Sequence, residues 1–124
     1  MTDLFYDIKK GIENIIKWLP IIWKDRDWDW AYLAEIMEFK LRNMADHNEK
    51  YSYHVGAEKE VRSMRVCAAL LKRLRDDNVY YDNAEAACGG MLGTGWADKV
   101  NELSKADSEY LFKVMNKRMR HWWC

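Results

Sequence analysis

The sequence is poor in the residues that build metal centres and membrane spans. Its 124 residues include one proline, three histidines and three cysteines. Cys67, Cys88 and Cys124 lack metal-like spacing, and a zinc site needs three or four converging ligands. No apolar run approaches the ~20 residues that a membrane-spanning helix requires. We therefore expect no metal, no cofactor and no membrane partner.

Net charge is lacking too. Twenty Lys and Arg balance 20 Asp and Glu, so bulk attraction to nucleic acid or to an anionic membrane is not implied. The N-terminus shows no basic segment followed by an apolar run, as a secretory signal would. We expect a cytoplasmic protein with free thiols, because disulfides are rare in a reducing compartment. Cys67 is expected to be a small core residue.

Two ligand-binding motifs are present only in part. Residues 25–29, Asp-Arg-Asp-Trp-Asp, begin like a calcium loop. However, Trp30 replaces its turn glycine and Ile36 its bidentate glutamate. Residues 90–95 have the glycine spacing of a phosphate loop, but Trp and Ala follow in place of Lys and Ser or Thr. We therefore predict that the protein is not an enzyme.

The composition that remains is globular. Apolar residues make up 49% of the chain and charged residues 32%, a balance typical of a folded domain rather than a disordered one. A chain of this length buries roughly two-thirds of its unfolded surface and forms one core. We expect residues 1–124 to form a single domain.

The first predicted helix has a continuous apolar side. Its apolar residues recur at spacings of three and four, which places them on one helical face. They are Leu4, Phe5, Ile8, Ile12, Ile15, Ile16 and Leu19. Pro20 cannot donate a backbone hydrogen bond and disfavours helical geometry at Leu19, so we expect this helix to end or kink there.

The second predicted helix begins near Trp28, with Asp25 or Asp27 as its N-cap. Its expected core face is Trp30, Leu33, Met37, Leu41 and Met44. Trp28, Tyr32 and Phe39 fall together on the opposite side. This helix is therefore either central and buried on both sides, or its second face is an exposed aromatic surface for a partner.

The third predicted helix runs from about Ala57 to Arg75. Its apolar stripe is Met64, Cys67, Leu71 and Leu74, flanked by Val61, Ala68 and Leu70. Its other side carries Arg62, Arg65, Lys72 and Arg73 around Ala69, and no acidic residue occurs between Val61 and Arg75. The sequence therefore predicts a local basic face on a neutral protein.

The last part of the chain is less regular. Asp and Asn residues between Asp76 and Asn83 favour turns, and the Gly-rich segment from Gly89 to Gly95 follows, with Trp96 at its edge. The last helix is expected to begin near Ser104 or Asp107. Its predicted apolar face is Leu111, Phe112, Met115, Met119 and Trp122. The sequence thus predicts an all-α, four-helix bundle-like domain with a Gly-rich loop before the last helix.

Aromatic and basic residues form the remaining candidate binding set. Its members are Trp28, Tyr32, Phe39, Arg62, Arg65, Lys72, Arg73 and Trp96. Aromatic rings stack on bases and Arg engages phosphate oxygens. A nucleotide or single-stranded nucleic acid would suit Trp28, Tyr32, Tyr80, Tyr81 and Trp96 with Arg62, Arg65, Lys72 and Arg73. Trp, Tyr and Arg also dominate protein-interface hot spots, which would suit a protein partner. Core tryptophans and solvated helix charges explain the same residues without any ligand.

A resemblance to a known family lies at both ends of the chain. The run from Ile16 to Trp30, residues 39–41 and 110–113, and the terminal Trp122-Trp123 pair are similar to a family of small uncharacterised bacteriophage proteins. The resemblance implies a phage source and carries no implication for mechanism.

The hypothesis that follows is a small, phage-type, non-enzymatic binding protein in the host cell cytoplasm. It would act as a counter-defence inhibitor by binding a host protein. The alternatives are sequestration of an anionic nucleotide signal, and a structural homo-oligomer that uses the second aromatic face.

Overall fold

The computed structural model describes residues 2–51, 56–88 and 95–122. These ranges contain five α-helices, one short 3₁₀ helix and no strand. The elements are α1 (Thr2–Lys24), α2 (Trp30–Tyr51), α3 (Ala57–Asp76), α4 (Asn78–Cys88), α5 (Trp96–Arg118) and the 3₁₀ helix η1 (Met119–His121). The all-α prediction is confirmed, but the described residues hold one α-helix more than the four predicted.

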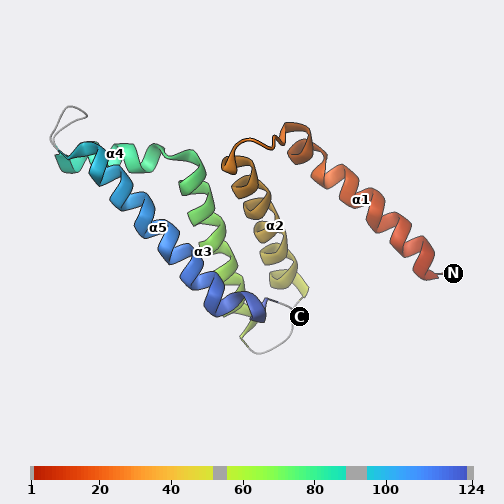
Figure 1. Cartoon of the computed structure of the whole chain (residues 1–124). Coiled ribbons are helices and arrows are strands. Elements are labelled where there is room, and N and C mark those ends of the chain that lie inside the picture. Colours follow the sequence, from red (N-terminus) through yellow and green to blue (C-terminus); the bar gives the residue numbers. More distant parts are fainter. Residues whose placement is uncertain (1, 52–55, 89–94, 123–124) are drawn as a thin grey trace.

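Three helices lie side by side in the order α2, α3, α5 (Figure 1). Both α2 and α5 pack against α3, and α4 packs against the first part of α5 at one end of this layer. By contrast, α1 leaves the start of α2 and points away from the other helices (Figure 1). The molecule is therefore a three-helix layer with a short cap and one projecting helix.

The core is centred on α3. Its predicted stripe of Met64, Cys67, Leu71 and Leu74 is buried, as are the flanking Val61, Ala68 and Leu70. Residues from the other helices complete the core, namely Ala34, Leu41, Ala45, Tyr80, Leu111 and Trp122. The prediction for this helix and for Cys67 is thus confirmed.

The buried side of α2 differs from the predicted one. Of the predicted face, Leu41 is buried and Met37 and Met44 pack against the core, but Trp30 and Leu33 are 53% and 58% exposed. The other buried residues of α2 are Ala34, Glu38, Ala45 and Asn48. Ala34 and Ala45 let the α2 backbone lie close to α3, since neither carries a bulky side chain. A pattern search weighted toward large apolar residues misses this seam.

The connection between α1 and α2 also corrects the prediction. Pro20 neither ends α1 nor marks the start of the connection, because the helix continues to Lys24. Pro20 is exposed, so water can satisfy the carbonyl group that loses its hydrogen bond. The N-cap of α2 is Asp29, whose Oδ1 accepts from the backbone N–H of Ala31 at 3.1 Å.

A single residue separates α3 from α4 where a longer turn was predicted. Asp77 adopts a left-handed conformation with φ of 64°, and its N–H donates to the carbonyl of Arg73 at 3.0 Å. The chain then enters α4, which buries Tyr80, and the Tyr80 hydroxyl donates to Asp107 Oδ2 at 2.6 Å. This long-range contact stabilises a helix that Asp and Asn disfavour locally.

The last helix begins at Trp96, earlier than the predicted Ser104 or Asp107. Its predicted apolar face is only partly covered, because Leu111 and Trp122 are buried whereas Phe112 and Met119 are more than half exposed. The buried Trp122 ring donates from Nε1 to Ser63 Oγ on α3 at 2.7 Å. The Gly-rich segment before Gly95, the pair Trp123 and Cys124, and residues 52–55 lie outside the described residues.

Candidate functional site

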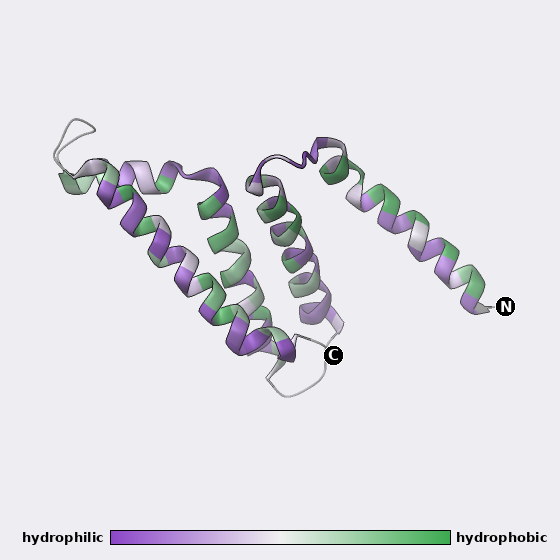
Figure 2. Cartoon of the chain, viewed as in Figure 1, coloured by the Kyte–Doolittle hydropathy of each residue, from purple (hydrophilic) through white to green (hydrophobic). Residues whose placement is uncertain are grey.

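The most prominent surface of the molecule is one side of α1. Nine large apolar residues on this helix are between 49% and 79% exposed. They are Leu4, Phe5, Ile8, Ile12, Ile15, Ile16, Leu19, Ile22 and Trp23, and we call them the α1 apolar face. At ~100° per residue they fall within an arc of about 120°. Hydrophobic residues accordingly recur along the whole helix (Figure 2).

Two contacts join α1 to α2, and both lie outside the α1 apolar face. Trp18 packs edge-on against Phe39 of α2, with ring centroids 4.6 Å apart. Lys24 Nζ lies 3.3 Å from Glu35 Oε1. These contacts fix the base of α1 and leave its apolar face uncovered. An amphipathic pattern indicates that a face needs cover, but it does not tell which chain supplies that cover.

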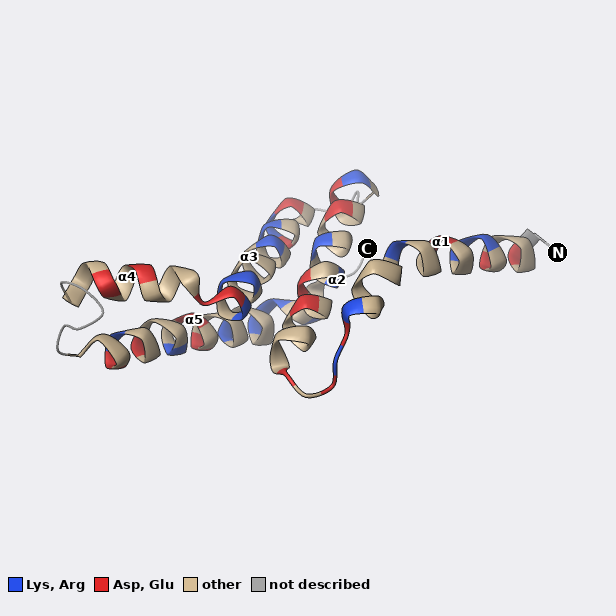
Figure 3. Cartoon of the chain, turned by 90° about the horizontal axis from the view of Figure 1, so that it is seen from above, with Lys and Arg blue, Asp and Glu red and all other residues tan. Residues whose placement is uncertain are grey.

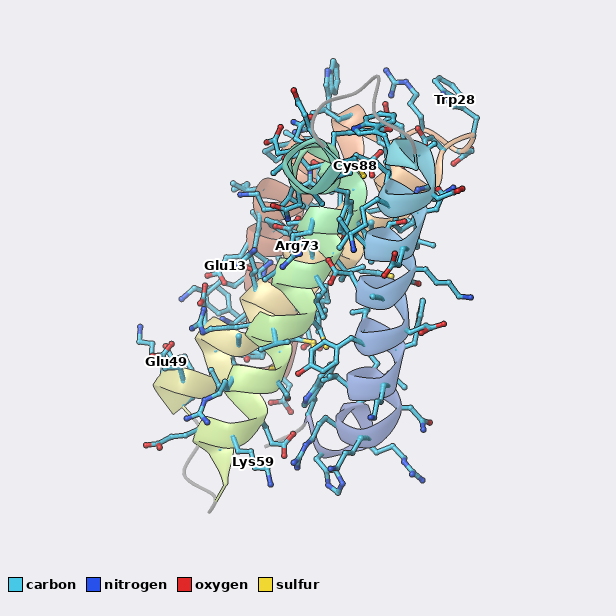
Figure 4. All side chains as sticks on the ribbon, turned by 90° about the vertical axis from the view of Figure 1, so that its left-hand side faces the viewer. Glu13, Trp28, Glu49, Lys59, Arg73 and Cys88 are labelled. Atoms are coloured by element: carbon cyan, nitrogen blue, oxygen red, sulfur yellow. The ribbon has the colours of Figure 1, made fainter. Side chains whose placement is uncertain are left out.

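The predicted aromatic surface of α2 is not assembled as one face. Phe39 is half-buried beneath Trp18, and Tyr32 is half-buried as well. Trp28 is 78% exposed on the connection before α2. In Figure 4 it stands at the opposite end of the molecule from Lys59. The second face of α2 is thus neither fully buried nor a continuous exposed aromatic surface, because Phe39 is covered by Trp18 whereas Trp28 is exposed.

The predicted basic face of α3 is partly neutralised by acids from other helices. Arg65 pairs with Asp46 at 3.1 Å and with Glu49, both on α2. Arg73 Nε lies 3.0 Å from Asp107 Oδ2 on α5. Arg62 and Lys72 are exposed and make no ion pair with any described residue. Half of the predicted set is thus engaged within the protein.

Trp96 is not close to the first turns of α3. It begins α5, is half-buried and stacks on Tyr81 of α4 with ring centroids 5.4 Å apart. The α3 residue Glu60 instead pairs with Arg118 at the other end of α5, at 3.4 Å. At ~1.5 Å per residue, about 30 Å of helix separates the two ends. Of the predicted nucleotide set, the structure therefore keeps Arg62 apart from Trp96. It does, however, place Arg73 over the Tyr80 ring, 5.8 Å from the centroid.

A basic groove that the sequence did not reveal lies between α3 and α5. It has a volume of about 300 Å³ and is lined by Lys59, Arg62, Ser63, Val66, Tyr110, Lys113, Val114, Lys117 and Arg118. We call it the α3–α5 basic groove. Five of its nine lining residues are Lys or Arg. Figure 3 shows Lys and Arg positions on both α3 and α5. Tyr110, Lys113 and Lys117 recur at helical spacing, which was the available sequence signal.

A second groove, between α2 and α5, is mainly apolar. Its volume is about 480 Å³, and α3 forms its floor. It is lined by Trp30, Leu33, Ala34, Met37, Leu71, Leu74, Asp77, Ser104, Lys105, Ser108, Leu111 and Phe112, and we call it the α2–α5 groove. A larger hollow of about 690 Å³ lies between α2 and α3, where Glu49 and Glu58 offset Arg62 and Arg65.

Candidate catalytic groups are sparse in the described ranges. Burial raises the pKa of the Cys67 thiol to about 11, so this thiol is protonated and inaccessible at neutral pH. Cys88 is half-buried at the end of α4. The described part of the chain holds no group of three or more His, Cys, Asp or Glu placed to bind a metal. Within it, no helix has the length and apolarity needed to cross a membrane.

No protein-family model, curated protein or solved structure matches this chain. Its function is therefore inferred from its own surfaces.

Proposed function

We propose that this protein acts by binding another protein, without catalysing a reaction, and that the α1 apolar face is its recognition surface. The observation that carries this proposal is the exposure of nine large apolar residues along one side of a 23-residue helix. Contiguous apolar patches of this extent mark interaction sites in folded proteins. An amphipathic helix that lies in an apolar groove is a common mode of protein recognition.

The α1 apolar face also carries aromatic residues of the kind that dominate protein interfaces. Phe5 lies near one end of it and Trp23 near the other, and aromatic side chains often supply most of the energy of an interface. Lys9, Lys10 and Lys17 on the polar side keep the helix soluble and oriented. We propose a host protein as the partner, with inhibition of a host defence as the outcome. This part of the proposal follows the resemblance described under Sequence analysis.

A pair of neighbouring substitutions tests this proposal. Ile15→Asp places a carboxylate on the apolar face, whereas Asn14→Asp adds the same charge to the polar face of the same helical turn. We expect Ile15→Asp to weaken partner binding at least about 100-fold, because burying an unpaired carboxylate is costly. Asn14→Asp should change the affinity less than about threefold, the usual range for an exposed position.

The measurement is a quantitative comparison of host polypeptides retained by each immobilised variant, followed by titration of the recovered polypeptide. Both variants must show wild-type helicity by circular dichroism. Equal recovery of the same polypeptide by both variants would show that the α1 apolar face is not the recognition surface.

A second candidate function is favoured by the α3–α5 basic groove. Lys59, Arg62, Lys113 and Lys117 make no ion pair with any described residue, and Tyr110 is exposed beside them. Clustered Lys and Arg attract phosphate groups, and an aromatic ring can stack on a base. We propose that an anionic nucleotide binds here. This site keeps Arg62 from the predicted set and leaves out Lys72, which lies outside the groove, and Arg65 and Arg73, which pair with acids of α2 and α5.

The nucleotide site is tested with Lys113→Glu, with Lys72→Glu as a control that makes the same change in charge outside the groove. With ATP as the probe, we expect Lys113→Glu to weaken binding about tenfold or more, since it replaces a phosphate contact with a repulsive charge. Lys72→Glu should have little effect. Isothermal titration calorimetry at physiological salt measures both, and an absence of saturable ATP binding to the wild type would exclude ATP as a ligand of this groove.

A further inference from the structure

Two uncovered apolar surfaces occur in the same chain, and their shapes are complementary. One is the α1 apolar face, which is convex. The other is the α2–α5 groove, where Leu33 and Phe112 on opposite walls are 58% and 59% exposed above the floor formed by α3. Large apolar side chains on both walls of a groove are unfavourably exposed to water, so filling the groove with a third apolar element lowers the free energy.

We infer that α1 of a second copy fills this groove, and that two copies exchange their α1 helices reciprocally. The exchange would complete the α2, α3 and α5 layer of each copy as a four-helix arrangement. This inference rests on the proposal that the α1 apolar face binds protein, and it names one partner for that face. The predicted four-helix bundle would then form between chains.

The helices have similar lengths. α1 and α5 each have 23 residues and α2 has 22. Four-helix bundles are built from helices of similar length that pack with short or crossed connections. The groove itself is lined along residues 30–37 of α2 and 104–112 of α5, about 12 Å at ~1.5 Å per residue. About two turns of α1 therefore fill it.

The attachment of α1 to α2 explains why α1 does not fill the α2–α5 groove of the same chain. Trp18 and Lys24 hold α1 against Phe39 and Glu35 of α2. At ~100° per residue these two α2 positions lie on the side opposite Leu33, which faces the groove. To reach the groove of its own chain, α1 would have to release both contacts and cross α2. A second copy can supply its α1 without breaking either contact.

The area involved reaches that of a small specific interface. A large apolar side chain removes on the order of 100 Å² from water when fully buried. The two turns of α1 that fit the groove carry about four residues of the α1 apolar face, which offer roughly 250 Å² at exposures between 49% and 79%. Two faces and the two grooves that receive them give on the order of 1,000 Å², about the lower bound for a specific interface.

The test is a complementation experiment between two variants of the full chain. Ile15→Asp breaks the α1 apolar face and leaves the groove intact. Leu33→Asp breaks the groove and leaves the α1 apolar face intact. Both positions are more than half exposed, so neither change removes core packing. The two substitutions give the same mass because Leu and Ile are isomers, so one variant is labelled uniformly with ¹⁵N. Native mass spectrometry over a concentration series, supported by light scattering, then separates each homodimer from the mixed dimer by mass.

We expect the wild type and the Asn14→Asp control to be dimers and each single variant to be a monomer. Mixing the two variants should restore a dimer that contains one chain of each, because the intact α1 of Leu33→Asp can enter the intact groove of Ile15→Asp. This dimer has one exchanged helix instead of two, so its affinity should be lower than that of the wild type.

Other occupants give other results, and each overturns the inference. A monomeric wild type means that the groove is closed by its own α1 or left for a foreign protein. A dimer that survives Leu33→Asp but not Ile15→Asp means that two α1 helices pair with each other. Two monomeric variants that form no mixed dimer show that α1 and the groove do not meet.

Failure of this inference is distinguishable from failure of the proposed function. Leu33→Asp leaves the α1 apolar face intact, so it should still capture the host polypeptide, and more readily than the wild type because no dimer competes. If the wild type is a monomer yet Ile15→Asp still abolishes host capture, only the exchange is wrong. If the mixed dimer forms but no host polypeptide depends on Ile15, only the host partner is wrong.

Discussion

Replacing Met64 with alanine is expected to lower the free energy of unfolding by about 3 kcal/mol, near the lower middle of the range for large-to-small core substitutions. Met64 is fully buried at the centre of α3. Its removal leaves a cavity that the surrounding helices can only partly fill. Asn48 Nδ2, itself buried, also loses its contact with Met64 Sδ at 3.7 Å. Denaturant unfolding followed by circular dichroism measures the change.

Met119→Ala is the matched control for this prediction. It removes the same side chain from a position that is 53% exposed, so its effect should stay within about 0.5 kcal/mol. Equal losses for the two variants would mean that Met119 is as well packed in solution as Met64. The described arrangement of η1 would then be wrong.

The same pair of residues shows how far a hydrophobic pattern leads. Met64 and Met119 both belong to predicted apolar stripes, and the prediction was right for Met64 and wrong for Met119. α3 is covered on both sides by α2 and α5, so every residue of its stripe is buried. The stripe of the last helix is covered in part, and the stripe of α1 is uncovered. Periodicity indicates the face of a helix, and only tertiary structure shows what covers it.

The missed helix has a similar physical cause. Asp76, Asp77 and Asn78 carry the signals of a turn, and Asp77 does break the helix. A new helix, α4, nevertheless begins at the next residue. It is stabilised by the burial of Tyr80 and by the hydrogen bond from Tyr80 to Asp107, 27 residues further along the chain. Local propensity cannot include such a contact. Long-range packing overrides weak local preferences of this size.

The sequence indicates which kinds of residue are candidates for binding, but not which of these residues lie together in the fold. Arg65 and Arg73 look free in the sequence because no acid occurs between Val61 and Arg75, yet α2 and α5 bring acids to both. Lys59 and Lys113 are 54 positions apart in the chain and line one groove. Their grouping depends on how α5 lies along α3, which the sequence alone does not specify.

Replacing Glu38 with alanine is expected to cost about 2–3 kcal/mol of stability, below the full value for breaking a buried ion pair because its partners are partly exposed. Glu38 is nearly buried on α2, where Oε1 accepts from Arg75 of α3 at 2.7 Å and Oε2 from Arg42 at 2.9 Å. Without the carboxylate, Arg75 is left partly buried with no counter-charge. Glu109→Ala is the control, since its pair with Lys105 is exposed and spans 4.0 Å, and it should cost about 0.5 kcal/mol or less.

The pH dependence of this loss identifies its cause. Burial alone raises the pKa of Glu38, but hydrogen bonds from Arg75 and Arg42 outweigh it and hold the pKa below its ordinary value. A carboxyl whose pKa is lower in the folded state stabilises fully above its unfolded pKa, about 4.3 for Glu, and loses that contribution as the pH falls through the folded pKa. The difference between the wild type and Glu38→Ala should therefore be largest near neutral pH and shrink toward pH ~3. A difference that stays constant over this range would assign the loss to packing of the side chain, and would leave the ion pairs between α2 and α3 without a measurable part in holding the layer together.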